Sequence, residues 1–329
     1  MIDRLRPRAS TRRRTLSITV LDAKTAAPPD GPRVGAVSYL NSKPLIEGLA
    51  ERLPAGLALD YPSRLAAALK AGDLDVALVP SIEVLQSGGR YEVVSDACVA
   101  ARGPVLSVKV YFRTPPGEVK TLSLDEGSRT SAILARVLLS HKYGVEPDTE
   151  PLPLEAGKIA ASKTIAATSA DAILLIGDRA MFPLDEQFQT VWDLGDEWLT
   201  WTGLPFVFAL WAARREDVPD GLATLLSSTR DYGVASADEI ARREATTLGL
   251  EPEVAIEYLT KHLHFTLGPA ERSGLKLFAQ LAQQAGLAPG GNELVFRDDP
   301  ADSGQCDIKT AAERAAPHAI APRRLVGAR

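Results

Sequence analysis

The sequence predicts an α/β protein whose chain folds into two lobes with a ligand cleft between them. Three observations lead to this prediction. Short β-type runs alternate with amphipathic helical stretches, which is typical of an open α/β sheet. Two long apolar strands, near 105–112 and 205–212, bracket a middle α/β block. The chain has 329 residues, more than the roughly 250–300 at which a single core usually stops growing.

The first lobe begins with three strands separated by helices. The strands are expected at residues 33–37, 57–61 and 76–79, and the last is apolar throughout, as in a parallel sheet with both faces covered. The first helix contains Pro44 in its first turn, with Ser42 as its cap. The second is capped by Ser63 and ends at Gly72, and the third opens at Ser81.

The middle block continues this alternation, and the chain after it is helical. A strand at 122–124 leads into a helix at 132–141, and a buried strand follows at 173–176. Beyond the 205–212 strand, helical segments are expected near 221–232, 237–248, 254–259 and 273–285. No internal repeat is evident.

These elements define a discontinuous first lobe, residues 33–112 and 205–290, around a second lobe, residues 113–204. The two long strands would cross between the lobes as a hinge, and the ligand would lie beyond the carboxyl ends of the strands. Residues 1–32 are expected to form a disordered basic leader, and residues 291–329, which lose their periodicity, a loose tail.

Composition and charge exclude several classes of protein. Lys and Arg number 37 and Asp and Glu 42, a net charge of −5, which argues against a nucleic-acid binder. No apolar run reaches the roughly 18–20 residues of a membrane span. Two cysteines and four histidines, without a metal-ligand spacing, predict neither a disulfide scaffold nor a metal site. No cofactor motif is present, and the oligomeric state is left open.

The basic leader has three interpretations. It contains six arginines within residues 1–14, which fits an export signal, a nucleic-acid or membrane arm, or a solvated segment. An export signal needs a continuous apolar stretch, and Ser17 and Thr19 interrupt the one that follows. We therefore favour a solvated leader that ends at the proline-rich linker 28–32.

Polar segments follow several strands, where a ligand would lie. In the first, SYLNS (38–42), Tyr39 and Asn41 would point the same way if the chain remains extended; an ordinary turn is the alternative. Ser81 either caps its helix or helps the helix N-terminus to bind an anion. Ser107, on the predicted hinge strand, would lie on the cleft floor unless it is simply a tolerated polar residue.

Two further segments are candidates. The segment GSRTS (127–131) places successive N–H groups, hydroxyls and a guanidinium at a helix start, an arrangement that suits a carboxylate or a phosphate. It is not a Walker loop, because no GKS/T is present. Segment 203–206 follows Trp198 and Trp201, which would either wall a ring-shaped ligand or pack in the core. His262 and His264 have a spacing that favours a structural role.

Six segments occur in an order that resembles the chorismate dehydratase family of the futalosine route to menaquinone. They are VGAVSYLNSKPLIEGL (34–49), DVALVPSIE (75–83), LDEGSRTSAILARVLL (124–139), DAILLIGDRAM (171–181), TGLPFVFALWAAR (202–214) and YLTKHLHFTLG (258–268). The resemblance covers residues 33–288. It implies the type II periplasmic-binding-protein fold, used by a cytoplasmic enzyme, which agrees with the two predicted lobes.

The resemblance implies a reaction and its groups. Chorismate would lose water to give 3-(1-carboxyvinyloxy)benzoate, without a redox cofactor or a metal. Asn41 and Ser107 are the catalytic candidates, and the base would be the substrate's own enolpyruvyl carboxylate or Glu83. The remaining candidates would bind substrate: Ser38, Tyr39, Ser81, Ser128, Arg129, Thr130, Ser131, Gly177, Asp178 and Pro205.

Two other functions remain open at this point. One is the later naphthoate-forming enzyme of the same pathway, whose N-terminal segment differs from SYLN. The other is a small-carboxylate binding protein without catalysis, for which export would be expected. Incubation with chorismate discriminates between binding and conversion.

Overall fold

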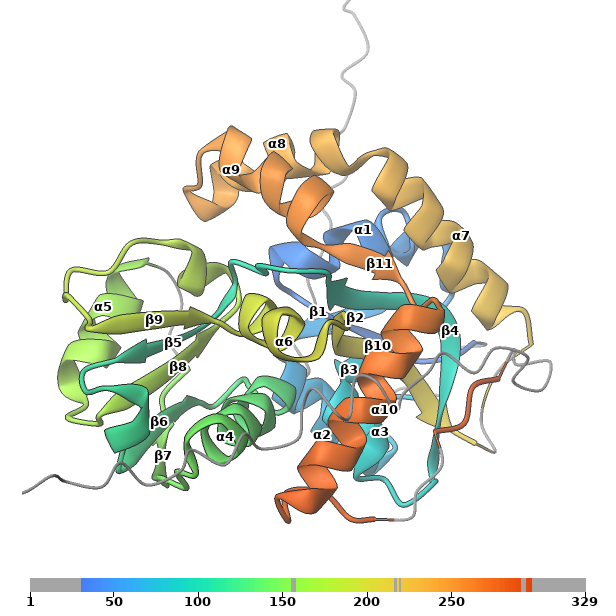
Figure 1. Ribbon diagram of the computed structural model, residues 1–329. Helices are drawn as coiled ribbons and strands as arrows, with labels where there is room; N and C mark the ends of the chain where they lie inside the picture. Colours follow the sequence, from blue (N-terminus) through green and yellow to red (C-terminus); the bar gives the residue numbers. More distant parts are fainter. Residues whose placement is uncertain (1–30, 155–157, 216–217, 219, 291–293, 298–329) are drawn as a thin grey trace, which may run out of the picture.

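The protein is described by a computed structural model that covers residues 31–154, 158–215, 218, 220–290 and 294–297. Its two sheets form two lobes, which Figure 1 shows side by side. This arrangement confirms the predicted α/β fold with two lobes, but the two strands predicted to form the hinge each lie within a single sheet. The predicted basic leader lies almost wholly outside the described residues.

The first lobe is built on a mixed sheet of six strands. In spatial order they are β11 (His264–Thr266), β4 (Tyr91–Ala101), β10 (Phe206–Arg214), β3 (Val76–Pro80), β1 (Val34–Val37) and β2 (Leu57–Asp60). Strand β1 pairs in parallel with β2 and β3, whereas β10 runs antiparallel to β3 and β4. Strands β1 and β3 are buried along their whole length, which explains their uninterrupted apolar sequences.

Seven of the described helices belong to this lobe (Figure 1). They are α1 (Lys43–Ile46), α2 (Pro62–Ala71), α3 (Ser81–Leu85), α7 (Leu222–Ala235), α8 (Ala237–Leu248), α9 (Pro252–Glu257) and α10 (Pro269–Gln284). Helices α2, α3, α7 and α10 pack on the sheet, whereas α8 and α9 pack on other helices. Prolines lie in the first turns of α1 and α2, where a missing N–H costs nothing. Gly72 ends α2 with φ +82°, as predicted.

The second lobe is built on a five-stranded sheet. Its strands in spatial order are β7 (Asp148–Leu152), β6 (Thr121–Asp125), β8 (Ala172–Ile176), β5 (Val108–Phe112) and β9 (Thr190–Asp193). Strand β6 is parallel to β7 and β8, and β5 is antiparallel to β8 and β9. The helices of this lobe are α4 (Thr130–Tyr143), α5 (Lys158–Ala167) and α6 (Leu194–Thr202).

The predicted lobe boundary at residue 112 is wrong. Residues 108–112 form β5, which lies inside the second sheet between β8 and β9. The last strand of the first lobe before the chain crosses over is β4. It was not predicted, because Ser95 and Asp96 interrupt its apolar pattern. The chain crosses to the second lobe over residues 102–107, which we call the first crossover, and returns through α6, the second crossover, to β10.

Part of the predicted C-terminal tail is ordered against the first sheet. Residues 294–297 run beside β4, where Val93 N donates to the Val295 carbonyl at 2.9 Å and Arg297 N donates to the Val93 carbonyl at 3.0 Å. Arg297 also forms an ion pair with Glu92 at 3.0 Å. The prediction of a loose tail from residue 291 is therefore corrected for this segment, and the rest of the tail lies outside the described residues.

The second crossover is anchored in the core of the first lobe. The fully buried Trp198 of α6 packs edge-on against Phe206 and Phe278, at centroid distances of 5.2 and 6.1 Å. Its indole N–H donates to the Pro205 carbonyl at 3.1 Å. Trp198 therefore serves core packing and not a ligand wall, the second of the two alternatives raised by the sequence.

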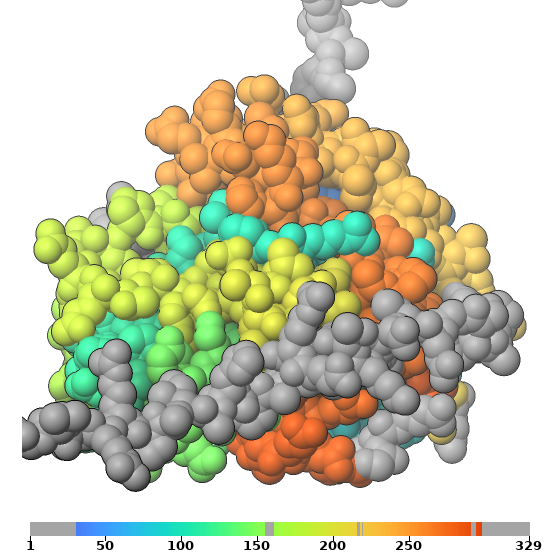
Figure 2. Space-filling view, viewed as in Figure 1, coloured from blue at the N-terminus to red at the C-terminus, as the bar shows by residue number. Residues whose placement is uncertain are grey.

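The two crossovers touch each other. On the face shown in Figure 2, the teal first crossover and the yellow α6 lie side by side between the lobes. A Cβ at Gly195 would lie 2.4 Å from the Gly103 carbonyl oxygen and 3.2 Å from Val105 Cβ. Only a residue without a side chain permits this approach.

Gly195→Ala is therefore expected to destabilise the protein by about 1–3 kcal/mol, although alanine favours helices more than glycine does. Thr200→Ala, on the exposed face of α6, is the matched control and is expected to be neutral or slightly stabilising. Urea unfolding of both variants measures the difference. Equal stability of the two variants would contradict the close contact between the crossovers.

Candidate active site

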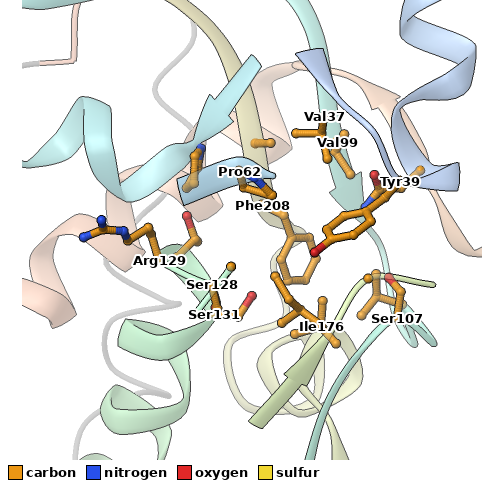
Figure 3. A pocket seen from close by; sticks show the side chains of 18 residues that line it. Val37, Tyr39, Pro62, Val99, Ser107, Ser128, Arg129, Ser131, Ile176 and Phe208 are labelled. Atoms are coloured by element: carbon orange, nitrogen blue, oxygen red, sulfur yellow. The ribbon is translucent and has the colours of Figure 1, made fainter. Parts of the chain in front are cut away.

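A cavity lies between the lobes at the carboxyl ends of β1, β3, β6 and β8, where open α/β sheets bind ligands. Its space, open solvent at the mouth included, amounts to about 550 Å³. Figure 3 shows polar side chains on opposite sides of the cavity and an apolar wall between them. The lining residues are Val37, Tyr39, Asn41, Pro62, Pro80, Val99, Val105, Ser107, Val108, Gly127, Ser128, Arg129, Thr130, Ser131, Ile176, Gly177, Phe208 and Ala209.

Tyr39 and Asn41 both line the cavity, as their spacing predicted. The chain does not remain extended through them, however, because Leu40–Ser42 form a 3-10 turn. Ser42 does not cap α1; its hydroxyl donates to the carbonyls of Val37 and Tyr39 and so fixes the turn. The buried Asn41 Oδ1 has no hydrogen-bond partner among the described residues. The turn therefore presents an unfilled acceptor at the cavity wall.

Ser107 is held at the end of the first crossover by an unusual turn. Its N–H donates to the Val105 carbonyl at 2.7 Å, which closes a three-residue γ-turn centred on Leu106. Leu106 has φ +61°, a left-handed conformation that is strained for a residue with a branched side chain. Such strain persists only where the surrounding structure enforces it, and it is common at functional sites.

Asp193 enforces this turn. Its carboxylate accepts hydrogen bonds from the N–H groups of Val105 at 2.9 Å and Leu106 at 2.7 Å. The same carboxylate caps α6 by accepting from Gly195 N at 3.0 Å and Asp196 N at 3.3 Å. One side chain thus ties the two crossovers together and fixes the backbone that carries Ser107.

The opposite side of the cavity is the N-terminus of α4. The N–H groups of Arg129, Thr130 and Ser131 have no acceptor among the described residues. Ser128 Oγ accepts from Ala132 N at 3.1 Å and caps the helix. Free N–H groups at the positive end of a 14-residue helix, beside the Ser131 hydroxyl, are an arrangement that suits a carboxylate.

Arg129 is the one charged residue in the lining, which lies wholly within the described chain. Its guanidinium points away from the cavity in Figure 3, and its Nε lies 3.8 Å from Glu83 Oε1. The Arg129 side chain is 54% exposed. It therefore stands at the mouth of the cavity, where it attracts anions without occupying the interior.

The loop that leads into α4 is held by a buried ion pair. Asp125 accepts from Arg179 Nη2 at 2.6 Å, and both side chains are almost fully buried. Asp125 also accepts from Gly127 N at 2.9 Å and from Ile176 N at 3.0 Å. The ends of β6 and β8 are thereby fixed to each other, so the helix start keeps its place beside the cavity.

An aromatic and apolar wall separates the two polar sides. Phe208 of β10 and Ile176 of β8 face each other across the cavity in Figure 3, and the Tyr39 ring lies beside them. A Cβ at Gly177 would lie 2.7 Å from the Tyr39 ring, and Gly177 has φ +74°, so this position requires glycine. Burial raises the pKa of the Tyr39 phenol, which therefore stays protonated as a hydrogen-bond donor.

The two lobes are linked on both sides of the cavity. On one side, Asp178 of the second lobe accepts from Leu40 N of the first lobe at 3.0 Å. On the other side, Thr130 Oγ1 of α4 accepts from Ile82 N of α3 at 3.2 Å. These bonds close the lobes around the cavity.

The structure brings most of the predicted site residues together. Eight of them line the cavity: Tyr39, Asn41, Ser107, Ser128, Arg129, Thr130, Ser131 and Gly177. Their parts in substrate binding and catalysis stay predictions.

Four predicted residues do not line the cavity, and their assignment to substrate binding is corrected. Ser38 is exposed. The Ser81 hydroxyl donates to the Val207 carbonyl at 2.8 Å, behind Thr130. The Pro205 carbonyl is bound by Trp198, and Asp178 links the lobes. Each of these residues lies at the end of a strand near the site, but its polar group is used by another part of the protein or faces solvent.

Sequence reasoning missed the apolar wall, Asp193 and Tyr258. Phe208 was predicted only as part of a strand. The one signal for its position was the alternation of side chains between the two faces of that strand. Tyr258, whose hydroxyl donates to Ser107 Oγ at 2.7 Å, was quoted within the segment YLTKHLHFTLG without a role. Nothing in the local sequence indicates that residues 107 and 258 meet.

Neither a metal centre nor a membrane span is found in the described part of the chain. No group of three or more His, Cys, Asp or Glu side chains there is placed to hold a metal ion. None of the helices in that part is both long and apolar enough to cross a membrane.

Comparisons with known proteins agree with this architecture. A family model described as menaquinone biosynthesis matches residues 32–284. The chain is 32% identical over 266 residues to the chorismate dehydratase of Thermus thermophilus, an alignment that covers 75% of this chain and 93% of that relative.

Solved structures show the same fold at low sequence identity. A protein from Archaeoglobus fulgidus superposes with a TM-score of 0.62 at 17% identity, covering 78% of this chain and 98% of that one. A gene product of Candida albicans, described as having the generic periplasmic binding protein fold, gives a TM-score of 0.53 at 12% identity, over 87% and 95% of the two chains.

The fold and the cavity define a two-lobed protein of the type II periplasmic-binding-protein class, with a small-molecule site between its lobes. Within that class, the chain belongs to the menaquinone biosynthesis family.

The contribution of the Asp178 carboxyl to folding stability is expected to depend on pH. Burial raises the pKa of the Asp178 carboxyl from 3.8 to about 6, although the Leu40 N–H and the Lys43 charge lower it. Between these values the folded chain binds more protons than the unfolded chain, so this group's contribution to stability falls as the pH rises through about 4–6.

Asp178→Asn keeps an acceptor for Leu40 and removes this titration. As the pH rises from 4.5 to 7.5, the unfolding free energy of the variant is expected to increase by roughly 2 kcal/mol relative to that of the native chain. Asp185→Asn, at an exposed position, is the control. A difference that stays constant over this pH range would contradict the raised pKa.

Proposed function

We propose that this protein is a chorismate dehydratase, which removes water from chorismate to give 3-(1-carboxyvinyloxy)benzoate. The observation that carries the proposal is the cavity itself. A carboxylate site at the start of α4 faces a pair of neutral hydrogen-bonding side chains, Asn41 and Ser107, across an apolar wall. The similarity to the chorismate dehydratase of Thermus thermophilus supports the choice of substrate.

Substrate binding follows from the distribution of charge. Chorismate carries two carboxylates, whereas the chain has a net charge of −5, so overall charge does not attract it. The N–H groups of residues 129–131 and the hydroxyl of Ser131 would bind one carboxylate as donors. Arg129 at the mouth would attract the dianion as it enters.

The apolar wall suits the ring of the substrate. Phe208, Ile176 and Val99 would contact its faces, and Tyr39 would donate a hydrogen bond from its edge. A dry wall of this kind excludes water from the reacting carbons and strengthens the electrostatic interactions of the bound carboxylates.

Asn41 and Ser107 are proposed to act on the leaving hydroxyl. In the reaction, the hydrogen on ring C3 is removed as a proton, the C4–O bond breaks, and the hydroxyl leaves as water, so that the ring becomes aromatic. Neither side chain titrates near neutral pH, so neither serves as the base. Their contribution is to orient the ring and to donate hydrogen bonds to the departing oxygen.

We propose the enolpyruvyl carboxylate of the substrate as the base. No carboxylate side chain is among the residues that line the cavity, all of which are described. Glu83, the protein alternative, lies outside this lining and faces Arg129. A carboxylate held over C3 has an effective concentration high enough to compensate for its weak basicity.

The pathway and the location of the enzyme rest on the family resemblance. We propose that the reaction is a step of the futalosine route to menaquinone and that it takes place in the cytoplasm. The membership in a menaquinone biosynthesis family supports the first of these assignments.

Asn41→Ala and Ser107→Ala are each expected to lower kcat with chorismate by about 10²–10³, the usual cost of losing one hydrogen-bond donor to a developing charge. Glu83→Gln is the matched control and is expected to keep kcat within about threefold. Formation of the aromatic product, followed by absorbance and by mass, provides the measurement.

Three results would contradict the proposal in different ways. Full activity of both alanine variants would remove Asn41 and Ser107 from the reaction. A large loss in Glu83→Gln alone would favour a protein base. Binding of chorismate by the native chain without conversion would identify a binding protein.

A further inference from the structure

A buried tyrosine lies directly behind Ser107, one of the two proposed catalytic side chains. The Tyr258 side chain is fully buried, and its hydroxyl donates a 2.7 Å hydrogen bond to Ser107 Oγ. Tyr258 is absent from the lining of the cavity, so its effect on the substrate passes through Ser107.

The hydrogen bond from Tyr258 decides where the Ser107 proton points. A hydroxyl that accepts one hydrogen bond still has its own proton to donate. Among the described residues, Ser107 Oγ has Tyr258 as its hydrogen-bond partner and no acceptor for its proton. Since Ser107 lines the cavity, this proton is available to a ligand bound there. Donation by Tyr258 also polarises the Ser107 hydroxyl and makes it a stronger donor.

Tyr258 is well suited to be a permanent donor. Burial raises the pKa of its phenol, so the phenol keeps its proton at neutral pH. The Tyr258 ring is therefore a neutral group that donates in one direction only. A neutral phenol suits this position, because a negative charge there would repel a dianionic substrate.

The backbone at Tyr258 is specialised. Tyr258–His262 form a π-helical turn that follows α9, and Leu263 N donates to the Tyr258 carbonyl at 3.2 Å. His262 Nδ1 lies 2.9 Å from the Pro104 carbonyl and so joins this turn to the first crossover. Such turns are rare and are concentrated at functional sites. The turn places the Tyr258 ring between the 39–42 segment and the first crossover.

We propose that Tyr258 is a positioning residue for the reaction, which fixes Ser107 in the orientation that serves the leaving hydroxyl. This inference rests on the proposed function, because it assigns no separate chemistry to Tyr258. It predicts that removal of the phenolic hydroxyl lowers the rate of water loss and leaves substrate binding almost unchanged.

The test is Tyr258→Phe in the full chain, measured with chorismate. The variant is expected to lower kcat by about 10- to 100-fold and to change KM by less than about threefold. Tyr111→Phe, which removes another buried hydroxyl in the second lobe, is the matched control and is expected to retain native kcat. Thermal unfolding of both variants establishes that each is folded at the assay temperature.

A double-mutant cycle separates positioning from a general structural effect. Because Tyr258 acts through Ser107, Tyr258→Phe is expected to cause less than about a twofold further loss in the Ser107→Ala background. An undiminished loss in that background would overturn the inference. Incorporation of 3-fluorotyrosine at position 258, which keeps the hydroxyl donor, is expected to hold kcat within about threefold of native, and a loss as large as that of phenylalanine would also overturn it.

The same set of variants distinguishes failure of this inference from failure of the proposed function. If Ser107→Ala loses activity and Tyr258→Phe keeps it, the inference is wrong and the proposed function stands. If Ser107→Ala is fully active, or if the native chain does not convert chorismate, both are wrong.

Discussion

The structure depends on the carboxylate of Asp193. It accepts four backbone N–H groups, two from the first crossover and two from the start of α6. The two lobes are joined by these crossovers, so a single side chain fixes one connection to the other. The resulting constraint forces the strained turn at Leu106 and thereby the direction of Ser107. Gly195 and Gly103 permit the close backbone contact that the arrangement requires.

The remaining features of the site follow from the way the lobes meet. Asn41 comes from the first lobe, Ser107 from a crossover and the start of α4 from the second lobe, so the cavity exists only when these parts are held together. Asp178 and Thr130 provide links on its two sides. Under the proposed function, dehydration needs hydrogen-bonding groups at the leaving oxygen and a bound substrate carboxylate that serves as the base.

Much of this organisation is predictable from the sequence, and the parts that are not have physical causes. The two long apolar runs around a middle α/β block predict the two lobes, and the polar segment after β1 makes Tyr39 and Asn41 candidates for the cavity. Strand β4 was not predicted because Ser95 and Asp96 interrupt its apolar pattern. The end of the first crossover was instead included in the strand predicted near 105–112. Asp193 and Tyr258 make contacts over 87 and 151 residues of chain, which periodicity does not encode. Ser81 and Pro205 lie where ligand groups were expected, but the Val207 carbonyl accepts the Ser81 hydroxyl and the Trp198 indole N–H binds the Pro205 carbonyl.

Under the proposed function, neutral side chains and a substrate carboxylate suffice for the reaction. A crystal structure of the Ser107→Ala variant with chorismate bound tests this most directly, because slow turnover preserves the substrate. We predict that the ring lies between Asn41 and residue 107, with one carboxylate on the N–H groups of residues 129–131 and the enolpyruvyl carboxylate over C3. A protein carboxylate within hydrogen-bonding distance of the C3 hydrogen, or a ligand bound outside the cavity, would contradict the account.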